Sequence, residues 1–490
     1  NGKSACKAAI SGEMRWPKKT NYVIGMVTVP ARPSDTIRTW GTMKDYFGLD
    51  GIIDEIKVYG SALEADQIKK EFDKYTVDEA DIAPRRLPTV KNAGSFGAFY
   101  TKLKYYPAWD ELWRVDEDPD IVVFFDDSPV KMIFWRGIRY GPCWVSENEN
   151  WMTDQSLETW GNGENDIEGC FEHMQDRHCR FSHVRMIENT PARAVVHWRY
   201  APVSSHGNTW KRHPKTGWEC WVDEYYTIYP DGAAVRKVSW QKDSTGRALQ
   251  LQESLPVTQP GQSNMELFGK DYVHVADYDY NTRAVSVDWR KQPSDWNRNY
   301  TVQQFNFHSK NKPFICFEPG NHMHVRWVPD GYNHFPVNQN RCDGRWRKTF
   351  DRPSHTTSSP CSRPVIHEEG DRLYWNALYG MNEMGMKELV SFGRSWAYAP
   401  GISVSGGFVS KGYDRSERCY QIENRSDKAG AIKIKLEGSK ESPVANPAFY
   451  VKNWNGNGAK VLVNGKAYED YKVGINRELE GKDLVVFVNL

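Results

Sequence analysis

Short runs of alternating apolar and polar residues, separated by turn-forming residues, dominate the chain from Ile121 onward. Three segments illustrate the pattern: DIVVFFDDSPVKMIFWRG, SHVRMIENTPARAVVHWRY and DEYYTIYPDGAAVRKVSW. In each, two strand-like runs flank a turn (DDSP, ENTPA or YPDG), which is typical of antiparallel hairpins. We see no sustained helical periodicity in this region. The pattern predicts an all-β chain whose residues 93–400 form one large antiparallel β-sandwich, the expected catalytic domain.

The N-terminal segment has a different pattern. Residues 48–72, GLDGIIDEIKVYGSALEADQIKKEF, predict a strand over residues 53–58 followed by a short helix. Ser61 and Glu64 are spaced as a capping box that would open this helix, whose apolar side chains (Leu63, Ile68, Phe72) are expected to point inward. The unit resembles the last strand and trailing helix of laminin-G-like, concanavalin-type jelly-roll modules. That resemblance implies a partial jelly-roll module over residues 1–77.

Two further boundaries follow from composition. Residues 78–92 contain two prolines and no apolar periodicity, so we expect a linker there. From residue 401 the segments become Lys-, Gly- and Val-rich, as in AIKIKLEG, AKVLVNGKAY and KDLVVFVNL. They predict a small C-terminal β-sandwich domain over residues 401–490, with a hairpin at VNGK and a structural role.

Charge and aromatic content narrow the function classes. Lys plus Arg number 64 against 63 for Asp plus Glu, a formal charge of +1, which argues against a nucleic-acid-binding or membrane-surface protein. No apolar run is long enough to span a membrane. Aromatic residues make up 13% of the chain and favour a β-rich protein, with a weaker indication of sugar binding. An acidic partner would have to meet a local basic patch.

The nine cysteines contain no CxxC pair, which argues against a zinc ribbon or a thioredoxin-like site. The pairs Cys170 with Cys179 and Cys342 with Cys361 have spacings that suit loop-closing disulfides. The sequence assigns no metal ligands and no cofactor. Whether the protein binds a structural calcium ion is left open, because its acidic loops are too sparse to assign a calcium site.

The densest group of polar residues is the segment His322–Ser359. It holds four histidines and several arginines on a stretch broken by Gly and Pro, together with amide side chains (Asn333, Asn338, Gln339). Such a concentration in an otherwise ordered sandwich suggests a functional loop. The alternative is a solvated loop in which Arg341 and Arg345 form surface ion pairs with acids such as Asp343.

A second group covers Trp135–Trp160 and Gly169–Arg185. Tyr140 and Asn148 are uncharged groups able to hydrogen-bond a carboxylate or sugar hydroxyls, and His173 is a candidate base or ligand. No HExxH or regular histidine pair appears, so a metal site is not favoured.

Together these residue types suit β-elimination from a uronate. Removal of the C5 proton places negative charge on a carboxylate that is already anionic, so Arg, Asn or Gln must neutralise it while a His or Tyr base and an acid act beside it. A glycoside hydrolase would instead need two carboxylic acids, for which Glu147, Glu149, Glu158 and Glu172 are available. A non-catalytic glycan-binding protein is the third hypothesis.

Four motifs carry a family resemblance: WRGIRYGPCWVSEN, DEYYTIYPDG, GYNHFPVNQ and NPAFYVKNW. They resemble the ulvan lyases of marine bacteria, most closely polysaccharide lyase family forty, over about residues 80–490. The resemblance implies a secreted bacterial enzyme, an acidic polysaccharide substrate built of sulfated rhamnose and uronate, and a His and Tyr elimination mechanism.

Carried onto this sequence, the mechanism makes His334 the first choice for the base, with His173 in reserve. Tyr225 or Tyr140 is the expected acid. The residues expected to bind and neutralise the substrate's carboxylate or sulfate are Arg341, Arg345, Asn148 and Asn333. Tyr225 and Tyr226 alternate along a predicted strand, so one of the two should lie in the core.

Overall fold

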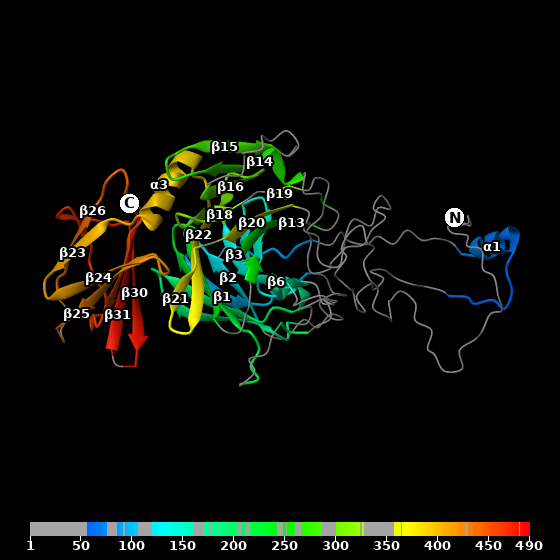
Figure 1. Ribbon diagram of the computed structural model, residues 1–490, viewed down its shortest axis with the longest axis horizontal. Helices are drawn as coiled ribbons and strands as arrows, with labels where there is room; N and C mark the ends of the chain where they lie inside the picture. Colours follow the sequence, from blue (N-terminus) through cyan, green and yellow to red (C-terminus); the bar gives the residue numbers. More distant parts are fainter. Residues whose placement is uncertain are drawn as a thin grey trace. The chain divides into compact units, whose positions relative to one another are not determined.

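The protein is all-β and is built around a large antiparallel sandwich (Figure 1). The computed structural model describes residues 56–75, 86–91, 94–105, 119–155, 157–160, 170–176, 179–203, 208–210, 216–242, 248–250, 252–259, 262, 266–286, 300–323, 326–327, 357–363, 365–426, 430–479 and 481–490. The chain divides into two compact units, of which the first contains α1 and the second contains all of the sheets.

The first large sheet has nine strands within the described residues. Their order is β1-β2-β3-β4-β5-β13-β20-β18, and β19 also pairs with β20. The bounds are β1 (Gly97–Thr101), β2 (Asp120–Phe124), β3 (Lys131–Phe134), β4 (Pro142–Val145), β5 (Trp151–Gln155), β13 (Gln252–Val257), β20 (Thr357–Arg363), β18 (His322–Met323) and β19 (Arg326–Trp327).

The second large sheet has ten described strands in the order β15-β14-β16-β17-β22-β11-β10-β9-β8, with β21 beside β22. The bounds are β15 (Thr282–Ser286), β14 (Phe268–Ala276), β16 (Val302–Phe307), β17 (Lys312–Phe317), β22 (Arg372–Asn382), β11 (Ala233–Gln241), β10 (Val222–Tyr229), β9 (Ala194–Tyr200), β8 (Ser182–Asn189) and β21 (His367–Glu369). A small sheet, β12 (Ala248–Gln250), β6 (Glu158–Trp160) and β7 (Cys170–Phe171), completes this region.

The three hairpins predicted from the alternating pattern are confirmed. They are the antiparallel pairs β2/β3, β8/β9 and β10/β11. In the last of them the YPDG turn ends on Gly232, whose φ of +73° lies in the left-handed region that glycine adopts without strain. Turn chemistry and strand alternation therefore agree, as the sequence predicted.

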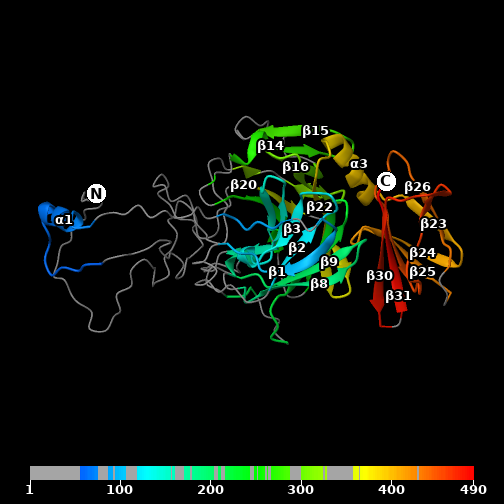
Figure 2. The same ribbon diagram turned by 180° about the vertical axis from the view of Figure 1, so that it is seen from behind.

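The two large sheets enclose one apolar core. Tryptophans from both sheets are completely or almost completely buried in it: Trp135, Trp144, Trp151, Trp198 and Trp375. Figure 2 shows the edge strands β1 and β8 side by side, and the amide of Asn189 joins them by accepting from Ala98 N (3.0 Å) and donating to Ala98 O (2.9 Å). This contact closes the sandwich at one edge.

A buried ion pair crosses the core side of the second sheet. Arg236 donates to both carboxylate oxygens of Glu224 (2.7 and 2.9 Å), and neither side chain is exposed to solvent. Tyr200 and Tyr226 also donate to Glu224 through their hydroxyls. Every charge here is matched, which makes the burial tolerable.

Helix α3 (Met386–Ala397) corrects the expectation that residues 93–400 lack helical periodicity. Its buried side chains Leu389, Val390 and Trp396 pack on the outer face of the second sheet, against residues such as Val235 and Leu378. Their spacing is that of one helical face. Because this one short helix directly follows the long strand β22, its period does not stand out in the sequence.

The strands from residue 401 form their own sheets. A five-stranded sheet has the order β24 (Phe408–Asp414), β25 (Cys419–Asn424), β27 (Ala448–Lys452), β31 (Gly481–Val488), β30 (Tyr471–Glu478), in which β25 and β27 are parallel. Two small pairs accompany it, β23 (Gly401–Ser405) with β26 (Lys433–Glu437) and β28 (Leu462–Val463) with β29 (Lys466–Ala467). The VNGK hairpin is confirmed: Asn464 and Gly465 have positive φ, as this turn type requires.

The N-terminal expectations need correction in detail. Helix α1 (Ala65–Phe72) begins later than predicted, because Glu64 is its N-cap and the backbone N–H of Glu64 donates to Gln67 (2.9 Å). Residues 56–59 form no strand, and Ile68 and Phe72 are exposed. The rest of the predicted jelly-roll module lies outside the described residues.

The cysteine expectation is also corrected. Cys179 is a buried thiol whose Sγ donates to Arg136 O (3.4 Å), so it forms no disulfide with Cys170. Cys342 of the other expected pair lies outside the described residues. No helix in the described part of the chain is both long and apolar enough to cross a membrane.

Candidate functional site

The outer face of the second sheet carries two adjacent rows of polar side chains, which we call the polar face. The first row crosses β8, β9, β10, β11 and β22 and consists of Arg185, His197, Tyr225, Lys237 and Asn376. The second extends to β21 and consists of His183, Arg199, Asp223, Ser239, Tyr374 and His367. Because strand side chains alternate between faces, these residues lie opposite the core.

Other parts of this outer face are covered. Helix α3 packs on Val235 and Leu378, and Tyr229 stacks on Phe487 of the C-terminal sheet (ring centroids 5.7 Å apart). Both covered regions lie near the turn that joins β10 and β11, whereas the polar face lies further from that turn on the same strands, and Tyr225 within it is half-buried. It is therefore a place where side chains of several strands meet at an accessible surface.

Asp223 organises one half of the polar face. Its carboxylate accepts hydrogen bonds from His197 Nε2 (2.7 Å), Arg199 Nε (2.6 Å) and Arg372 Nη2 (2.8 Å). Burial opposes ionisation of Asp223, but the hydrogen bonds from His197 and Arg199 and the charge of Arg372 hold its pKa well below the usual range. The hydrogen bond to Asp223 in turn raises the pKa of Arg199.

The ring of Tyr225 stacks on His197, with centroids 4.6 Å apart and planes within 8° of parallel. Arg185 Nε donates to His197 Nδ1 (3.2 Å), while His197 Nε2 donates to Asp223. Both ring nitrogens of His197 are therefore occupied, and the imidazole orients the tyrosine ring.

A second stacked pair lies at the other end of the polar face. His367 and Tyr374 have ring centroids 5.0 Å apart, and His367 Nε2 is 2.7 Å from Glu318 Oε2. Lys237 Nζ lies 4.4 Å from the centroid of the Tyr374 ring. Burial raises the pKa of Tyr374, although Lys237 acts in the opposite direction, which favours the protonated phenol.

Basic side chains outnumber acidic ones on the polar face itself. Four cations lie on it or at its border: Arg185, Arg199, Lys237 and Arg372. Asp223 is the carboxylate within its two rows, and the exposed Glu369 pairs with Lys237 at the margin (3.0 Å). An anionic ligand thus meets several donors on one surface.

An aromatic side chain flanks the same surface. Trp221 directly precedes β10, and the Arg199 guanidinium lies 6.0 Å from its ring centroid. The His183 ring is 6.2 Å away from it. Such a ring offers an apolar face to a sugar next to charged donors.

Several residues expected from the sequence lie outside the described residues: His334, Asn333, Arg341 and Arg345. Of the described ones, Tyr225 lies on the polar face, and Tyr226 is the member of that pair in the core. Asn148 is exposed in the turn after β4, where its amide donates to His308 O (2.7 Å), away from the polar face.

Tyr140 and His173 occupy core positions that argue against the roles expected for them. Tyr140 has no exposed surface and packs among the core aromatics. His173 is 1% exposed and meets the Trp198 ring edge-on (4.8 Å). Burial, and then the charge of Arg139, lower the pKa of His173 well below its usual range. Both side chains support the fold instead of facing a substrate.

The acids considered for a hydrolase lie elsewhere. Glu147 accepts from Asn311 Nδ2 (3.1 Å), and Glu149 pairs with Lys131 (2.8 Å). Glu158 and Glu172 are buried. Neither a pair of these carboxylates nor a group of three metal-binding side chains is found on the polar face as described.

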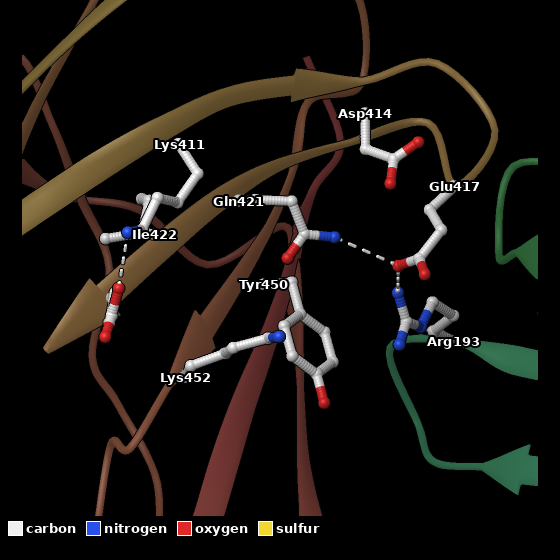
Figure 3. A pocket seen from close by; sticks show the side chains of 9 residues that line it. Arg193, Lys411, Asp414, Glu417, Gln421, Ile422, Tyr450 and Lys452 are labelled. Carbon is white, nitrogen blue, oxygen red and sulfur yellow. Dashed lines mark hydrogen bonds and ion pairs between the residues drawn. The ribbon is translucent and has the colours of Figure 1, made fainter. Parts of the chain in front are cut away.

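A pocket of about 600 Å³ lies beyond the polar face, beside the C-terminal sheet (Figure 3). Arg193, which precedes β9, reaches Glu417 there (3.0 Å), and Lys411 pairs with Glu423 (2.8 Å). Tyr450 and Lys452 also line the pocket, but none of its lining residues is a histidine, so it lacks the combination of His, Tyr and cations found on the polar face. We therefore take the polar face as the candidate site.

Sequence inspection missed most of the polar face. Its members Arg185, His197, Arg199, Lys237 and His367 are single polar residues within strand-like runs. The signal that could have found part of it was hairpin register: aligning β10 and β11 on their turn places Tyr225 opposite Lys237. In β8 and β9 an irregularity between Met186 and Glu188 shifts the register and brings Arg185 opposite His197, which alignment on the turn does not predict.

Comparisons with known proteins leave the family open. Neither a protein-family model nor a curated protein sequence matches the chain. Among solved structures, the chain is similar to the galactose 1-epimerase from Lactobacillus acidophilus NCFM, with 9% sequence identity and a TM-score of 0.28 over 59% of this chain and 100% of that chain. A likeness this weak adds nothing to the fold, which rests on the sheets described above.

Proposed function

We propose that the protein is a polysaccharide lyase that cleaves a uronate-containing, sulfated glycan, most closely ulvan, by β-elimination. The observation that carries the proposal is the polar face, where two stacked His/Tyr pairs lie among four basic side chains on one accessible sheet surface. These are the residue types that the reaction requires.

The physical argument concerns the charge that develops on the substrate. Removing the C5 proton of a uronate adds electron density to its carboxylate, and preorganised cations next to that carboxylate lower the barrier. Lys237 and Arg372 can serve in this way, because both are partly exposed beside the Tyr374 ring and Asp223 respectively. Loss of one such donor typically costs about 3 kcal/mol of transition-state stabilisation.

The sequence resemblance supports the same reading. The motif DEYYTIYPDG, similar to that of ulvan lyases, forms β10 and its turn and supplies Asp223 and Tyr225. An ulvan-degrading enzyme would act outside the cell, so we place the protein in the secreted or cell-surface fraction of a bacterium.

The test is to incubate the full chain with ulvan and, in parallel, with alginate, pectate and chondroitin sulfate. We expect new ultraviolet absorbance from an unsaturated uronate with ulvan. New reducing ends without that absorbance would instead indicate a glycoside hydrolase, and binding without any product would indicate a non-catalytic glycan-binding protein. Either of these results overturns the proposal.

A further inference from the structure

We infer that His367 is the general base and Tyr374 the general acid of this elimination, an assignment that rests on the lyase function proposed above. The two rings are register partners on β21 and β22 and stack with centroids 5.0 Å apart. The reacting C5–H and C4–O bonds of a uronate are on adjacent atoms, so a base and an acid this close can serve one sugar residue.

Glu318 fixes the orientation of His367. This carboxylate directly follows β17, is 2% exposed, and lies 2.7 Å from His367 Nε2. Asn376 Nδ2 also donates to Glu318 (3.0 Å), and the Arg415 guanidinium lies 3.6 Å away. An ionised carboxylate can only accept, so in the neutral imidazole of His367 the proton is on Nε2 and the lone pair is on Nδ1.

The free lone pair distinguishes His367 from His197, the histidine of the other stacked His/Tyr pair. His197 Nδ1 accepts from Arg185, and His197 Nε2 donates to Asp223. Within the described part of the chain, His367 Nδ1 has no hydrogen-bond partner, and its side chain is 31% exposed. A base needs an available lone pair that a substrate can approach, and His367 meets that condition where His197 does not.

Tyr374 is suited to give the proton. Its pKa is raised by burial, so the phenol stays protonated at neutral pH and can donate to the leaving oxygen. Tyr225, the acid expected from the sequence, lies on β10, and two further strands separate it from β21. At a strand spacing of about 4.8 Å it is roughly 14 Å from His367, too far to act on the same bond.

The step balances without a cofactor. His367 Nδ1 takes the C5 proton, the C5–H electron pair forms the C4=C5 double bond, and the C4–O bond breaks. Tyr374 protonates the departing oxygen, which becomes a hydroxyl. The imidazolium then loses its proton to solvent while the phenolate recovers one, which restores the starting state.

The arrangement also selects the substrate's stereochemistry. Both groups project from one face of a sheet, so they reach the sugar from the same side. Same-side elimination requires the C5 proton and the C4 oxygen to be on one side of the ring, as in glucuronate. In iduronate, the C5 epimer, they are on opposite sides. We expect the enzyme to cleave at glucuronate.

The experiment compares purified full-length variants on ulvan. His367→Ala should lower kcat by about 10²- to 10⁴-fold with little change in KM, and added imidazole should restore part of the rate. His367→Gln and Tyr374→Phe should lose comparable activity while their thermal unfolding matches the parent protein. Glu318→Gln, a change in a positioning residue, should lower kcat and leave KM unchanged. His274→Ala, on the distant strand β14, is the matched control and should keep full activity.

The outcomes separate the two proposals. If the parent protein forms unsaturated uronate but His367→Ala retains kcat within about threefold, the catalytic assignment is wrong and the lyase function stands. Loss of activity in His334→Ala together with retention in His367→Ala would move the base to the segment His322–Ser359. NMR of a complete digest shows which uronates are consumed. Equal consumption of glucuronate and iduronate would contradict elimination by two groups on the same side of the sugar. If no uronate polymer yields unsaturated product, the function itself fails.

Discussion

Replacing Asp223 by Asn should destabilise the protein by an amount that depends on pH. The Asp223 carboxylate is 4% exposed and accepts from His197, Arg199 and Arg372 at 2.6 to 2.8 Å. An amide at this position would lack the charge and would present N–H groups where these donors now meet carboxylate oxygens.

The magnitude follows from the number and exposure of these bonds. Hydrogen bonds to a charged group contribute roughly 1.5–3 kcal/mol each when buried. The Arg199 and Arg372 side chains are 40% and 31% exposed, so water replaces most of what they lose. His197 is 4% exposed and loses its acceptor without such compensation. We expect Asp223→Asn to cost about 2–3 kcal/mol of unfolding free energy at neutral pH.

The sign of the pH dependence is set by the depressed pKa of Asp223. A carboxyl whose pKa is lower in the folded than in the unfolded state stabilises fully above its unfolded pKa of about 3.9, and the contribution is lost as the pH falls through the folded pKa. The difference between the parent and Asp223→Asn should therefore be constant from pH 7 to pH 5 and shrink below about pH 4.

Urea unfolding followed by tryptophan fluorescence at pH 7, 5 and 3.5 measures this difference. Asp371→Asn, which changes an exposed acid one residue before β22, is the matched control and should cost less than about 0.5 kcal/mol. A destabilisation by Asp223→Asn that is absent at pH 7, or that is equal at all three pH values, would refute the argument.

Three further predictions concern the core and the binding surface. Glu224→Gln should lower the free energy of unfolding in urea by about 3–5 kcal/mol, because Arg236 would be buried without its counter-charge. The double variant Glu224→Leu with Arg236→Met should lose less, and an equal loss in the two variants would contradict this prediction. Trp221→Ala should raise KM for the glycan several-fold and leave kcat unchanged, since the ring only flanks the site; an unchanged KM would remove the ring from the binding surface. Raising ionic strength from about 0.05 to 0.5 M should raise KM through screening of the basic side chains, and a salt-independent KM would argue against an electrostatic role.

Most of the sandwich could be predicted because hairpins are local. In β10 and β11 the turn residues and the alternation lie within one short segment, and they fix which residues pair. Helix α3 was missed for a related reason. Its apolar positions, such as Leu389 and Val390, contact strands from several distant parts of the sequence, and the helix is too short to stand out from the long strand before it.

The candidate site was predictable only in part, because it depends on pairing between hairpins. The sequence places Tyr225 on a strand and leaves its direction open, and the structure directs it to the polar face. What brings it next to His197 is the pairing of β10 with β9, and what brings Lys237 next to Asn376 is the pairing of β11 with β22. Neither pairing has a local signal in the sequence, since turn chemistry fixes register only across a tight turn, and long connections separate β9 from β10 and β11 from β22.

Asp223 and Glu224 show that strand register decides which residues support the core and which belong to the candidate site. The two acids are consecutive, and alternation sends them to opposite sides of the sheet. Glu224 accepts from Arg236 and is sealed in the core, whereas Asp223 binds Arg199 and Arg372 at an accessible surface. A shift of one residue in β10 would exchange their environments, turning Asp223 into the core and Glu224 away from Arg236 toward the outer face. The buried pair thus helps to specify the register on which the candidate site depends, so we expect Glu224→Gln to lower activity as well as stability.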